Sequence, residues 1–239
     1  MDAQTYLRYT ANGYHIERNA FTPEEVAAMI AHYMALNAEG GHPGDFAGVP
    51  TKTASAAPDP LARYPRQIQM HLWDPQTRQW MEDPRLTSVI AALTGQTPCL
   101  LQTMLYFKPP GSRGQSFHQD NLYLRTTPLM AAWVALDAAD RENGAMEMVR
   151  GSHLLGLLPC RLADTDLSFT DSETVVPSGL PHDLIALAPG DVVFFGGLTV
   201  HGSMPNTTKD RFRRAFICHY EGENALPIVG PPLPKAEAK

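Results

Sequence analysis

The chain has 239 residues, a hydrophobic content of 44% and a formal net charge of −6 at pH 7, which suit a single domain over residues 1–239 with a sizeable core. The acidic balance argues against nucleic acid or an anionic membrane as a main partner, and no apolar run is long enough to span a bilayer. Three scattered cysteines and a start without signal-peptide features predict a cytoplasmic protein without disulfides.

The N-terminal region predicts a short strand and a turn, followed by a helix. Residues 6–21 supply the strand, and Asn12-Gly13 supplies the turn. A helix then starts after Thr22, which can act as its N-cap, with Pro23 in the first helical position and Glu25 completing a capping box. Apolar residues follow at helical spacing, so we expect one face of this helix to pack on a sheet.

A long irregular stretch separates this helix from the next elements. Residues 39–65 are rich in Gly, Pro, Ala and Asp, as is typical of a lid or binding loop. The alternation of polar and apolar residues over 66–73 then predicts a strand. A second helix is predicted from Asp83-Pro84 to Thr94, ended by Gly95.

The second half predicts mostly short strands separated by turns. A mainly β fold with flanking helices follows, as an eight-stranded jelly roll of the cupin-like kind. Residues 160–183 interrupt the strands as a second loop over the mouth of the barrel, and the tail, about 228–239, is expected to be loosely ordered. The predicted strands cover residues 101–107, 116–125, 130–137, 145–149, 191–195, 198–201 and 213–220.

Two histidines and one carboxylate form the candidate metal site. His118 and Asp120 are two residues apart, so in a strand both side chains lie on one face. His201 lies in another strand-like segment much later in the chain. Two His and one carboxylate on one face of an ion are typical of non-haem Fe(II) oxygenases, although an H-x-D tripeptide alone is more often part of a surface strand.

These residues belong to a set that resembles the phytanoyl-CoA dioxygenase family of Fe(II)/2-oxoglutarate oxygenases, from about residue 9 to residue 222. The resemblance implies a double-stranded β-helix, in which His118, Asp120 and His201 ligate Fe(II) and O₂ is a further reactant. The motifs that carry the resemblance are Lys108-Pro109-Pro110-Gly111, His118-Gln119-Asp120, Ala132-Trp133-Val134-Ala135, Glu142-Asn143-Gly144, Gly151-Ser152-His153, His201-Gly202-Ser203, Asn206 and Arg213-Arg214-Ala215.

The same resemblance implies a 2-oxoglutarate site. Arg213 would pair with the distal carboxylate, helped by Ser203, while Met104 and Trp133 would line the cosubstrate pocket. A guanidinium group fits a carboxylate with two parallel hydrogen bonds. Strand alternation makes neighbouring side chains point in opposite directions, so Arg214 is the alternative if the longer loop before it shifts the register.

Several residues have an equally simple structural interpretation. Trp133 stands in an apolar segment and can be a core aromatic residue, and His153 and His219 are expected to be packed, hydrogen-bonded histidines. The sequence leaves open whether Lys108 faces a pocket or the surface. The family usually has Pro before Gly-Ser-His, where this chain has Arg150, which leaves the geometry of that turn open.

The expected reaction is oxidation, usually hydroxylation, of an unactivated C–H bond, with release of succinate and CO₂. Asp120 argues against halogenation, because related halogenases lack this carboxylate. No long basic segment offers a handle for CoA, so a small metabolite is favoured over an acyl-CoA. Arg66 and Arg125 are candidate anchors for an anionic substrate group. The alternative is a cupin-like metal-binding module without catalysis; the sequence does not predict the oligomeric state.

Overall fold

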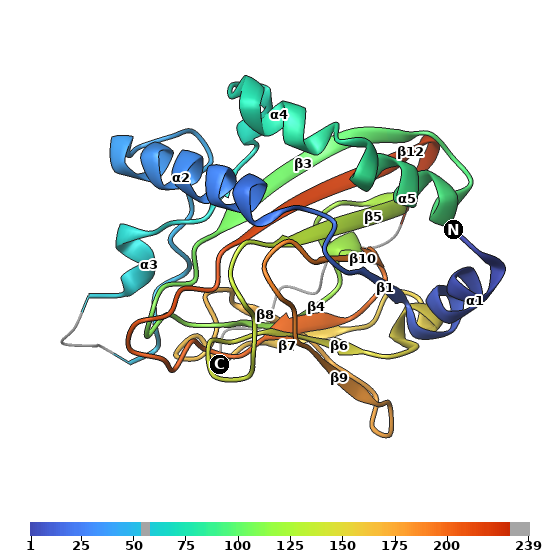
Figure 1. The fold of residues 1–239 in the computed structure, drawn as a ribbon. Helices are drawn as coiled ribbons and strands as arrows, with labels where there is room; N and C mark the ends of the chain where they lie inside the picture. Colours follow the sequence, from blue (N-terminus) through green and yellow to red (C-terminus); the bar gives the residue numbers. More distant parts are fainter. Residues whose placement is uncertain (54–57, 230–239) are drawn as a thin grey trace.

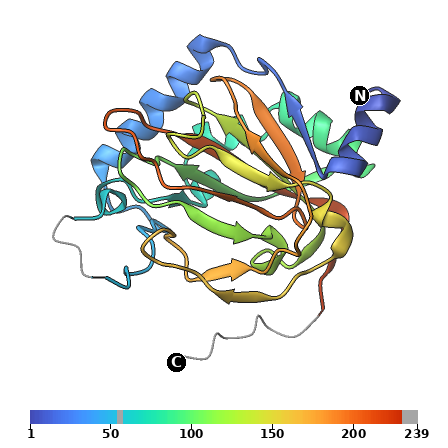
Figure 2. The same cartoon turned by 90° about the horizontal axis from the view of Figure 1, so that it is seen from below.

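A computed structural model describes residues 1–53 and 58–229. Two β-sheets face each other, and helices from the first half of the chain cover the outer face of the larger sheet (Figure 1). The view from below shows the smaller sheet in front of the larger one (Figure 2). This arrangement confirms the predicted jelly roll, which is mainly β with flanking helices.

The larger sheet has six strands and the smaller sheet has four, and all neighbouring strands pair antiparallel. In spatial order the larger sheet contains β1 (Tyr14–Glu17), β10 (Val192–Gly196), β5 (Thr126–Ala135), β12 (Ala215–Pro227), β3 (Pro98–Tyr106) and β2 (Gln67–Ile68). The smaller sheet contains β4 (Gln115–His118), β11 (His201–Ser203), β6 (Met146–Val149) and β9 (His182–Ile185), and a separate pair contains β7 (Cys160–Leu162) and β8 (Ser172–Thr174).

The helices carry the start and stop signals that the sequence predicts. Thr22 caps the second helix and forms both bonds of the capping box with Glu25, and Gly95 ends the last helix with φ 69°. The helices are α1 (Ala3–Asn12), α2 (Pro23–Glu39), α3 (Pro60–Arg63), α4 (Pro75–Met81) and α5 (Pro84–Thr94), with 3₁₀ turns η1 (Met70–Leu72), η2 (Asp120–Leu122) and η3 (Ser152–Leu155).

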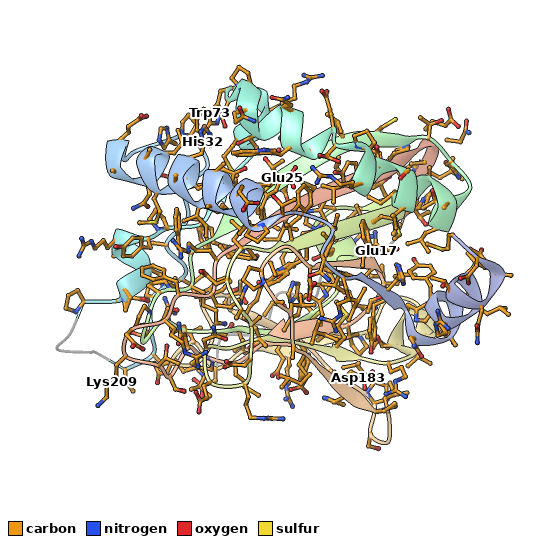
Figure 3. The ribbon with its side chains drawn as sticks, viewed as in Figure 1. Glu17, Glu25, His32, Trp73, Asp183 and Lys209 are labelled. Carbon is orange, nitrogen blue, oxygen red and sulfur yellow. The ribbon has the colours of Figure 1, made fainter. Side chains whose placement is uncertain are left out.

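The larger sheet is buried on both faces, as its apolar strand sequences predict. Alternate residues of β5 divide between two cores: Ala132 and Val134 pack under the helices, whereas Ala131 and Trp133 face the smaller sheet. Figure 3 shows the outer layers, with Glu25 and His32 on the helical side and Asp183 on β9 on the opposite side. The space between the two sheets is where inward-facing polar residues can form a site.

The N-terminal prediction was wrong about the first element. Residues 3–12 form a helix instead of a strand, because the Asp2 carboxylate caps it by accepting a hydrogen bond from the Thr5 backbone N–H at 2.7 Å. Gly13, with φ 86°, ends that helix, so the predicted turn at Asn12-Gly13 is a helix terminus. The short strand β1 follows immediately.

The strand predicted over residues 66–73 is also mostly wrong. Only Gln67 and Ile68 pair with β3, because Gln69 adopts a left-handed backbone conformation with φ 64° and the chain turns into η1. The helix α4, which the sequence did not predict, begins directly afterwards. The Asp74 carboxylate caps it by accepting a hydrogen bond from the Thr77 backbone N–H at 3.0 Å.

The two long irregular stretches lie against each other. Val49 donates a backbone hydrogen bond to the Phe169 carbonyl oxygen at 2.9 Å, and Thr53 donates one to the Asp166 carboxylate at 3.0 Å. The second stretch is not entirely loop, since β7 and β8 form a small hairpin within it.

At the C-terminus, the Ile228 backbone N–H is bonded to the Arg125 carbonyl oxygen. The rest of the predicted loose tail, 230–239, lies outside the described residues. A search of the described segments found no helix with the length and apolar character that crossing a membrane requires.

Candidate metal centre

Three elements meet to form the candidate metal site. His118 ends β4 and His201 begins β11, and the antiparallel pairing places these two residues directly opposite each other. Contrary to the prediction from its spacing, Asp120 does not continue the strand but begins the 3₁₀ turn η2. The turn still directs the Asp120 carboxylate towards the two histidines. The three predicted ligands therefore come together, although Asp120 is in a turn and not in a strand.

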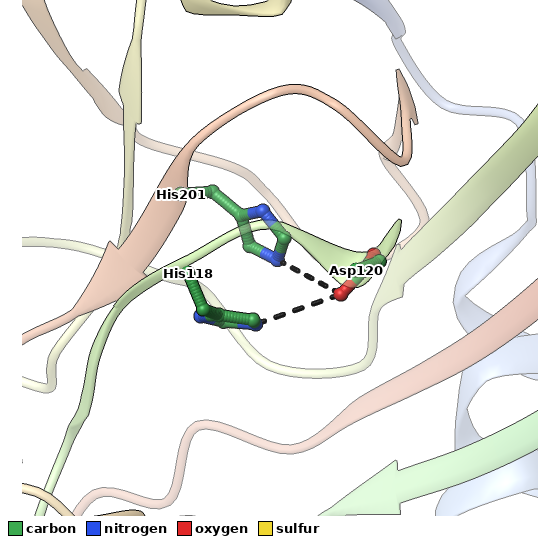
Figure 4. A group of neighbouring side chains, drawn as sticks. All are labelled: His118, Asp120 and His201. Atoms are coloured by element: carbon green, nitrogen blue, oxygen red, sulfur yellow. Dashed lines mark ion pairs between the residues drawn. The ribbon is translucent and has the colours of Figure 1, made fainter. Parts of the chain in front are cut away.

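The three side chains present their ligand atoms to one small space. Asp120 Oδ1 lies 3.6 Å from His118 Nε2 and 3.7 Å from His201 Nε2 (Figure 4). All three ligand atoms lie within 4.8 Å of one another, and each residue is only 6% exposed. Two imidazole nitrogens and one carboxylate oxygen at this separation fit one divalent transition-metal ion.

The surroundings fix each ligand in the orientation that binds metal. His118 Nδ1 lies 3.0 Å from the Ser116 carbonyl oxygen, and His201 Nδ1 lies 3.0 Å from the Thr199 carbonyl oxygen. Because a carbonyl only accepts, each Nδ1 carries the hydrogen and each Nε2 keeps its lone pair for the metal.

The carboxylate of Asp120 is oriented from its other side. His219, on β12, is 1% exposed, and its Nε2 donates to Asp120 Oδ2 at 3.0 Å. That bond leaves Oδ1 facing the two histidine ligands, as in other metal sites whose carboxylate ligands are hydrogen-bonded from behind.

The protonation states also suit a metal site. Burial, together with the neighbouring His201, lowers the pKa of His118 to about 3, so its ring is neutral at physiological pH. Burial alone would raise the pKa of Asp120, but His201 and His219 outweigh that effect and lower it. The site therefore presents a neutral imidazole and an ionised carboxylate, which are the ligand forms of these groups.

A buried pair of cations lies next to the triad. Arg213 and Lys108 are each 4% exposed; Arg213 Nε donates to the Gly144 carbonyl oxygen at 3.1 Å, and Lys108 Nζ donates to Ser203 Oγ at 2.9 Å. Within residues 1–53 and 58–229, neither cation has a carboxylate within ion-pair distance. Both line one small cavity with Ser203.

The electrostatic cost of these two cations indicates an anion site. Burial lowers the pKa of Arg213 to about 10, and burial with the adjacent positive charge of Arg213 lowers the pKa of Lys108 well below its usual value. An uncompensated buried charge is costly, whereas a paired one is tolerated. A bound carboxylate would offset this cost for both residues.

The side chains of the neighbouring Arg213 and Arg214 point in different directions, as strand alternation predicts. Arg213 faces the metal cavity, and its guanidinium lies 5.2 Å from the centre of the Trp133 ring. Arg214 points elsewhere and forms a two-pronged ion pair with Asp137, with distances of 2.7 and 2.8 Å. The cavity that contains the triad is also lined by Met104, Trp133 and Ser203.

Arg66 and Arg125, the two tentative substrate anchors, differ in position. Arg66 lines a second cavity that shares His118 and Asp120 with the first, and it also lines the small cavity that contains Arg213 and Lys108. Arg125 Nε instead donates to the Ile228 carbonyl oxygen at 3.3 Å, and Arg125 does not line either cavity.

His153 bonds the Thr10 carbonyl oxygen through Nε2 at 3.0 Å, in agreement with the structural role expected for it.

Two residues of this region had only weak signals in the sequence. His219 shares the inward parity of Arg213, but only the fold reveals its bond to Asp120. Lys108 precedes Pro109 and adopts φ 38°, and its burial beside Ser203 depends on the approach of β11. Spacing along one chain cannot locate such contacts between distant segments.

Comparison with known proteins identifies relatives for nearly the whole chain. A family model described as phytanoyl-CoA dioxygenase matches residues 9–215. Peroxisomal phytanoyl-CoA dioxygenase of Rattus norvegicus is 25% identical over 224 residues, which cover 89% of this chain and 66% of that protein. Phytanoyl-CoA dioxygenase domain-containing protein 1 of Danio rerio is 32% identical over 167 residues, 66% of this chain and 57% of the relative. The matched region thus spans 57–66% of these relatives' length.

Solved structures share the fold. The non-haem α-ketoglutarate-dependent epimerase SnoN from nogalamycin biosynthesis superposes with a TM-score of 0.73 at 23% identity, covering 99% of this chain and 91% of the other. EvdO2 from Micromonospora carbonacea var. aurantiaca, solved with 2-oxoglutarate, gives 0.72 at 23% identity, covering 98% and 95%. Since the family model matches residues 9–215 of 239, the chain belongs to the phytanoyl-CoA dioxygenase family.

Proposed function

We propose that the protein is an Fe(II)- and 2-oxoglutarate-dependent dioxygenase that oxidises an unactivated C–H bond of a small metabolite. The overall reaction consumes O₂ and 2-oxoglutarate and releases succinate and CO₂, with one oxygen atom entering the substrate when the outcome is hydroxylation. The observation that carries this proposal is the placement of a His-Asp-His triad beside two buried cations that lack a carboxylate partner in the described structure.

The residues fit both groups. His118, Asp120 and His201 would hold Fe(II) on one face and leave its remaining positions for 2-oxoglutarate and O₂. Arg213 and Ser203 would bind the distal carboxylate of 2-oxoglutarate, and we add Lys108 as a second cation at that end. When bound, the iron supplies the redox chemistry that couples decarboxylation of 2-oxoglutarate to C–H oxidation.

The protein's own contribution is position, charge and exclusion of water. His219 holds the carboxylate of Asp120 so that one oxygen faces the metal position. Met104 and Trp133 give the cavity apolar walls, which strengthen the charge interactions of the cosubstrate with Arg213. Solved relatives of this fold include enzymes named as an epimerase and a carbocyclase, so the fate of the oxidised carbon depends on how a substrate is placed.

The direct test is turnover of the cosubstrate. Purified protein with Fe(II), ascorbate and 2-oxoglutarate should form succinate and CO₂, whereas Asp120→Ala should not. Protein that binds Fe(II) but forms no succinate under any condition would support the alternative of a non-catalytic cupin-like module. Addition of phytanoyl-CoA tests the acyl-CoA alternative: we expect no stimulation, and a large stimulation would favour an acyl-CoA hydroxylase.

We place this activity in the cytoplasm. The three cysteines, Cys99, Cys160 and Cys218, are all free thiols, as is usual in reducing compartments. Fractionation of the source cells with an antibody to the chain would test the compartment, and recovery in a membrane-enclosed fraction would contradict this placement.

A further inference from the structure

A buried glutamine stands between the two metal ligands that are close together in the chain. Gln119 is 0% exposed, and its backbone is extended, with φ −120° and ψ 129°. Because side chains alternate along an extended chain, His118 and Asp120 face the metal position and Gln119 points to the opposite side. Gln119 lines neither of the two cavities that contain His118 and Asp120. Its side chain is therefore not placed to touch the metal or a substrate.

The amide group of Gln119 instead binds backbone groups of two other segments. Nε2 donates to the carbonyl oxygens of Leu198 and Gly156, at 2.8 Å each, and Oε1 accepts from the Leu158 backbone N–H at 2.8 Å. Two carbonyl partners at one amide atom and one N–H partner at the other define which atom is the nitrogen. Both donors of the amide are used, so the side chain is held in one orientation.

Leu198 belongs to the turn that leads into the third metal ligand. Residues 197–200 connect β10 with β11, which begins at His201. The next carbonyl after that of Leu198 belongs to Thr199, and it lies 3.0 Å from His201 Nδ1, whose hydrogen it accepts. Fixing the Leu198 carbonyl therefore fixes the peptide next to the group that orients the His201 ring.

A second contact attaches the same turn to the segment of Asp120. The Asn121 backbone N–H donates to the Gly197 carbonyl oxygen at 3.0 Å. A side-chain carbon added at Gly197 would lie only 2.6 Å from Asn121 Oδ1, so the close approach of the two segments requires glycine there. The residues on either side of Asp120 are thus both bonded to the turn before His201. The relative position of these two ligands depends on contacts that do not involve the ligands themselves.

We propose that Gln119 is a positioning residue of the metal centre, whose amide holds the segment before His201 against the segment that carries His118 and Asp120. Without this side chain, three backbone groups lose their partner in the protein, and the segments shift until water or other groups replace it. Such a shift moves His201 Nε2 relative to the other two ligand atoms. The inference rests on the proposed function for the identity of the reaction, but metal binding alone tests it.

Metal binding by two Gln119 variants tests the proposal. Gln119→Met nearly keeps the size of the side chain but loses all three hydrogen bonds, whereas Gln119→Glu loses the two donated bonds and keeps an acceptor for Leu158. We expect both variants to bind Mn(II) about 10- to 100-fold more weakly than wild type, the usual range for residues that support metal ligands. The absorption spectrum of bound Co(II), which reports the arrangement of its ligands, should also change in both variants.

The matched control is a second buried amide with the same bonding pattern. Asn143 is 1% exposed; its Nδ2 donates to the carbonyl oxygens of Ala138 and Phe212 at 2.7 and 3.3 Å, and its Oδ1 accepts from the Asp140 backbone N–H at 2.9 Å. None of these residues lines a cavity with the metal ligands. Asn143→Leu should therefore lower the unfolding temperature, as Gln119→Met does, but leave the Mn(II) affinity and the Co(II) spectrum unchanged.

A double-mutant cycle separates positioning of His201 from a general loss of stability. If Gln119 acts through His201, Gln119→Met should change Mn(II) affinity less than about two-fold in a His201→Ala background. A loss there as large as in wild type would overturn the proposal, and so would unchanged metal binding in both Gln119 variants. Circular dichroism spectra show which variants fold, and Gln119→Glu decides the outcome if Gln119→Met does not fold. If neither folds, Gln119 is required for folding and the proposal is overturned.

Failure of the proposed function gives a different result. Wild-type protein whose Mn(II) binding depends on Gln119 as described, but which forms no succinate from 2-oxoglutarate, would support the positioning role and contradict the proposed function. Succinate formation by wild type together with unchanged metal binding in both Gln119 variants would have the opposite meaning. Wild-type protein that binds neither Mn(II) nor Co(II) would contradict the metal assignment, and with it both proposals.

Discussion

The metal centre and the two long irregular stretches, 39–65 and 160–183, are built in different ways. His118 and His201 belong to paired strands, and each ligand is almost fully buried with its orientation fixed by a backbone carbonyl. The two stretches are connected by a few bonds between loops, such as Val49 to Phe169, and by an ion pair between the largely exposed Lys52 and Asp164. One region is held by regular pairing and the other by individual contacts.

We expect this difference to separate the residues that determine the chemistry from those that determine which substrate binds. A metal site needs its ligands within a few tenths of an ångström, which strands provide. Recognition of different molecules requires segments that can change without disturbing the sheets, and loops tolerate such changes. Arg66 connects the two regions, because it lies at the edge of a sheet and contacts rings from both loops.

The largest effect should follow from breaking the triad itself. His118→Ala, Asp120→Ala and His201→Ala should each abolish succinate formation and weaken Mn(II) binding in equilibrium dialysis, because one of three ligands is removed. The fold should persist, since each side chain faces a cavity and is not part of the apolar core. His182→Ala is the control, as His182 pairs with Glu147 on the outside. Normal metal binding in two of the three variants would contradict the assignment.

The next effect separates Arg213 from Arg214. Arg213→Ala should raise the KM for 2-oxoglutarate by tens- to thousands-fold, because loss of a buried charge-assisted pair costs roughly 2–5 kcal/mol. Arg214→Ala should leave KM nearly unchanged but lower stability, because Asp137 loses both prongs of an ion pair whose side chains are only 18% and 20% exposed. Steady-state kinetics with 2-oxoglutarate as the varied component measure both. A larger increase in KM for Arg214→Ala than for Arg213→Ala would mean that Arg214, and not Arg213, binds the cosubstrate.

A smaller effect on Mn(II) affinity is expected from changes at His219, which holds Asp120 from the side away from the metal position. His219→Phe should lower the affinity for Mn(II) by about 10- to 100-fold, the usual range for outer partners of metal ligands, because Asp120 Oδ2 loses its hydrogen bond. His219→Gln retains a donor and should recover part of the loss. The affinity for 2-oxoglutarate, measured at saturating Mn(II), should change little. Full Mn(II) affinity in His219→Phe together with a loss in His219→Gln would show that the packed ring, and not the hydrogen bond, is what His219 supplies.

Much of the candidate site could be predicted from the sequence, because its residues lie in short motifs whose order is preserved along the chain. Strand alternation predicted only that Arg213 and Arg214 point in opposite directions, and the choice of Arg213 came from the resemblance. In the structure Arg213 lines the metal cavity together with Ile217 and His219. The shared-strand argument for Asp120 was wrong in detail, since the strand ends at His118.

Other features depended on contacts that a linear pattern does not contain. The first helix was missed although both of its end signals, the N-cap Asp2 and the C-terminal Gly13, are present in the sequence. Gln69 ended a strand whose alternation looked regular, because its left-handed backbone follows from the tertiary fold and not from local propensity. The charge environment of Arg66 depends on Phe46 and Phe169, which the chain brings together from both loops.

The smallest effect on the chemistry is expected from Arg113, which connects the stretches 39–65 and 160–183. Arg113 is 9% exposed; its guanidinium pairs with Asp59 at 2.6 Å and donates to the carbonyl oxygens of Thr165 and Ser168 at 2.9 and 3.0 Å. Arg113→Ala leaves these acceptors without their donor, a loss of about 1–3 kcal/mol in local stability. We expect faster proteolytic cleavage within 39–65 and 160–183, while Mn(II) affinity stays unchanged.

The control for this prediction lies on the same loop hairpin. Arg161 pairs with Glu173 at 2.8 Å but is largely exposed, so Arg161→Ala should hardly change the cleavage rate. Cleavage that is insensitive to Arg113→Ala would mean that the two stretches are stabilised by other contacts.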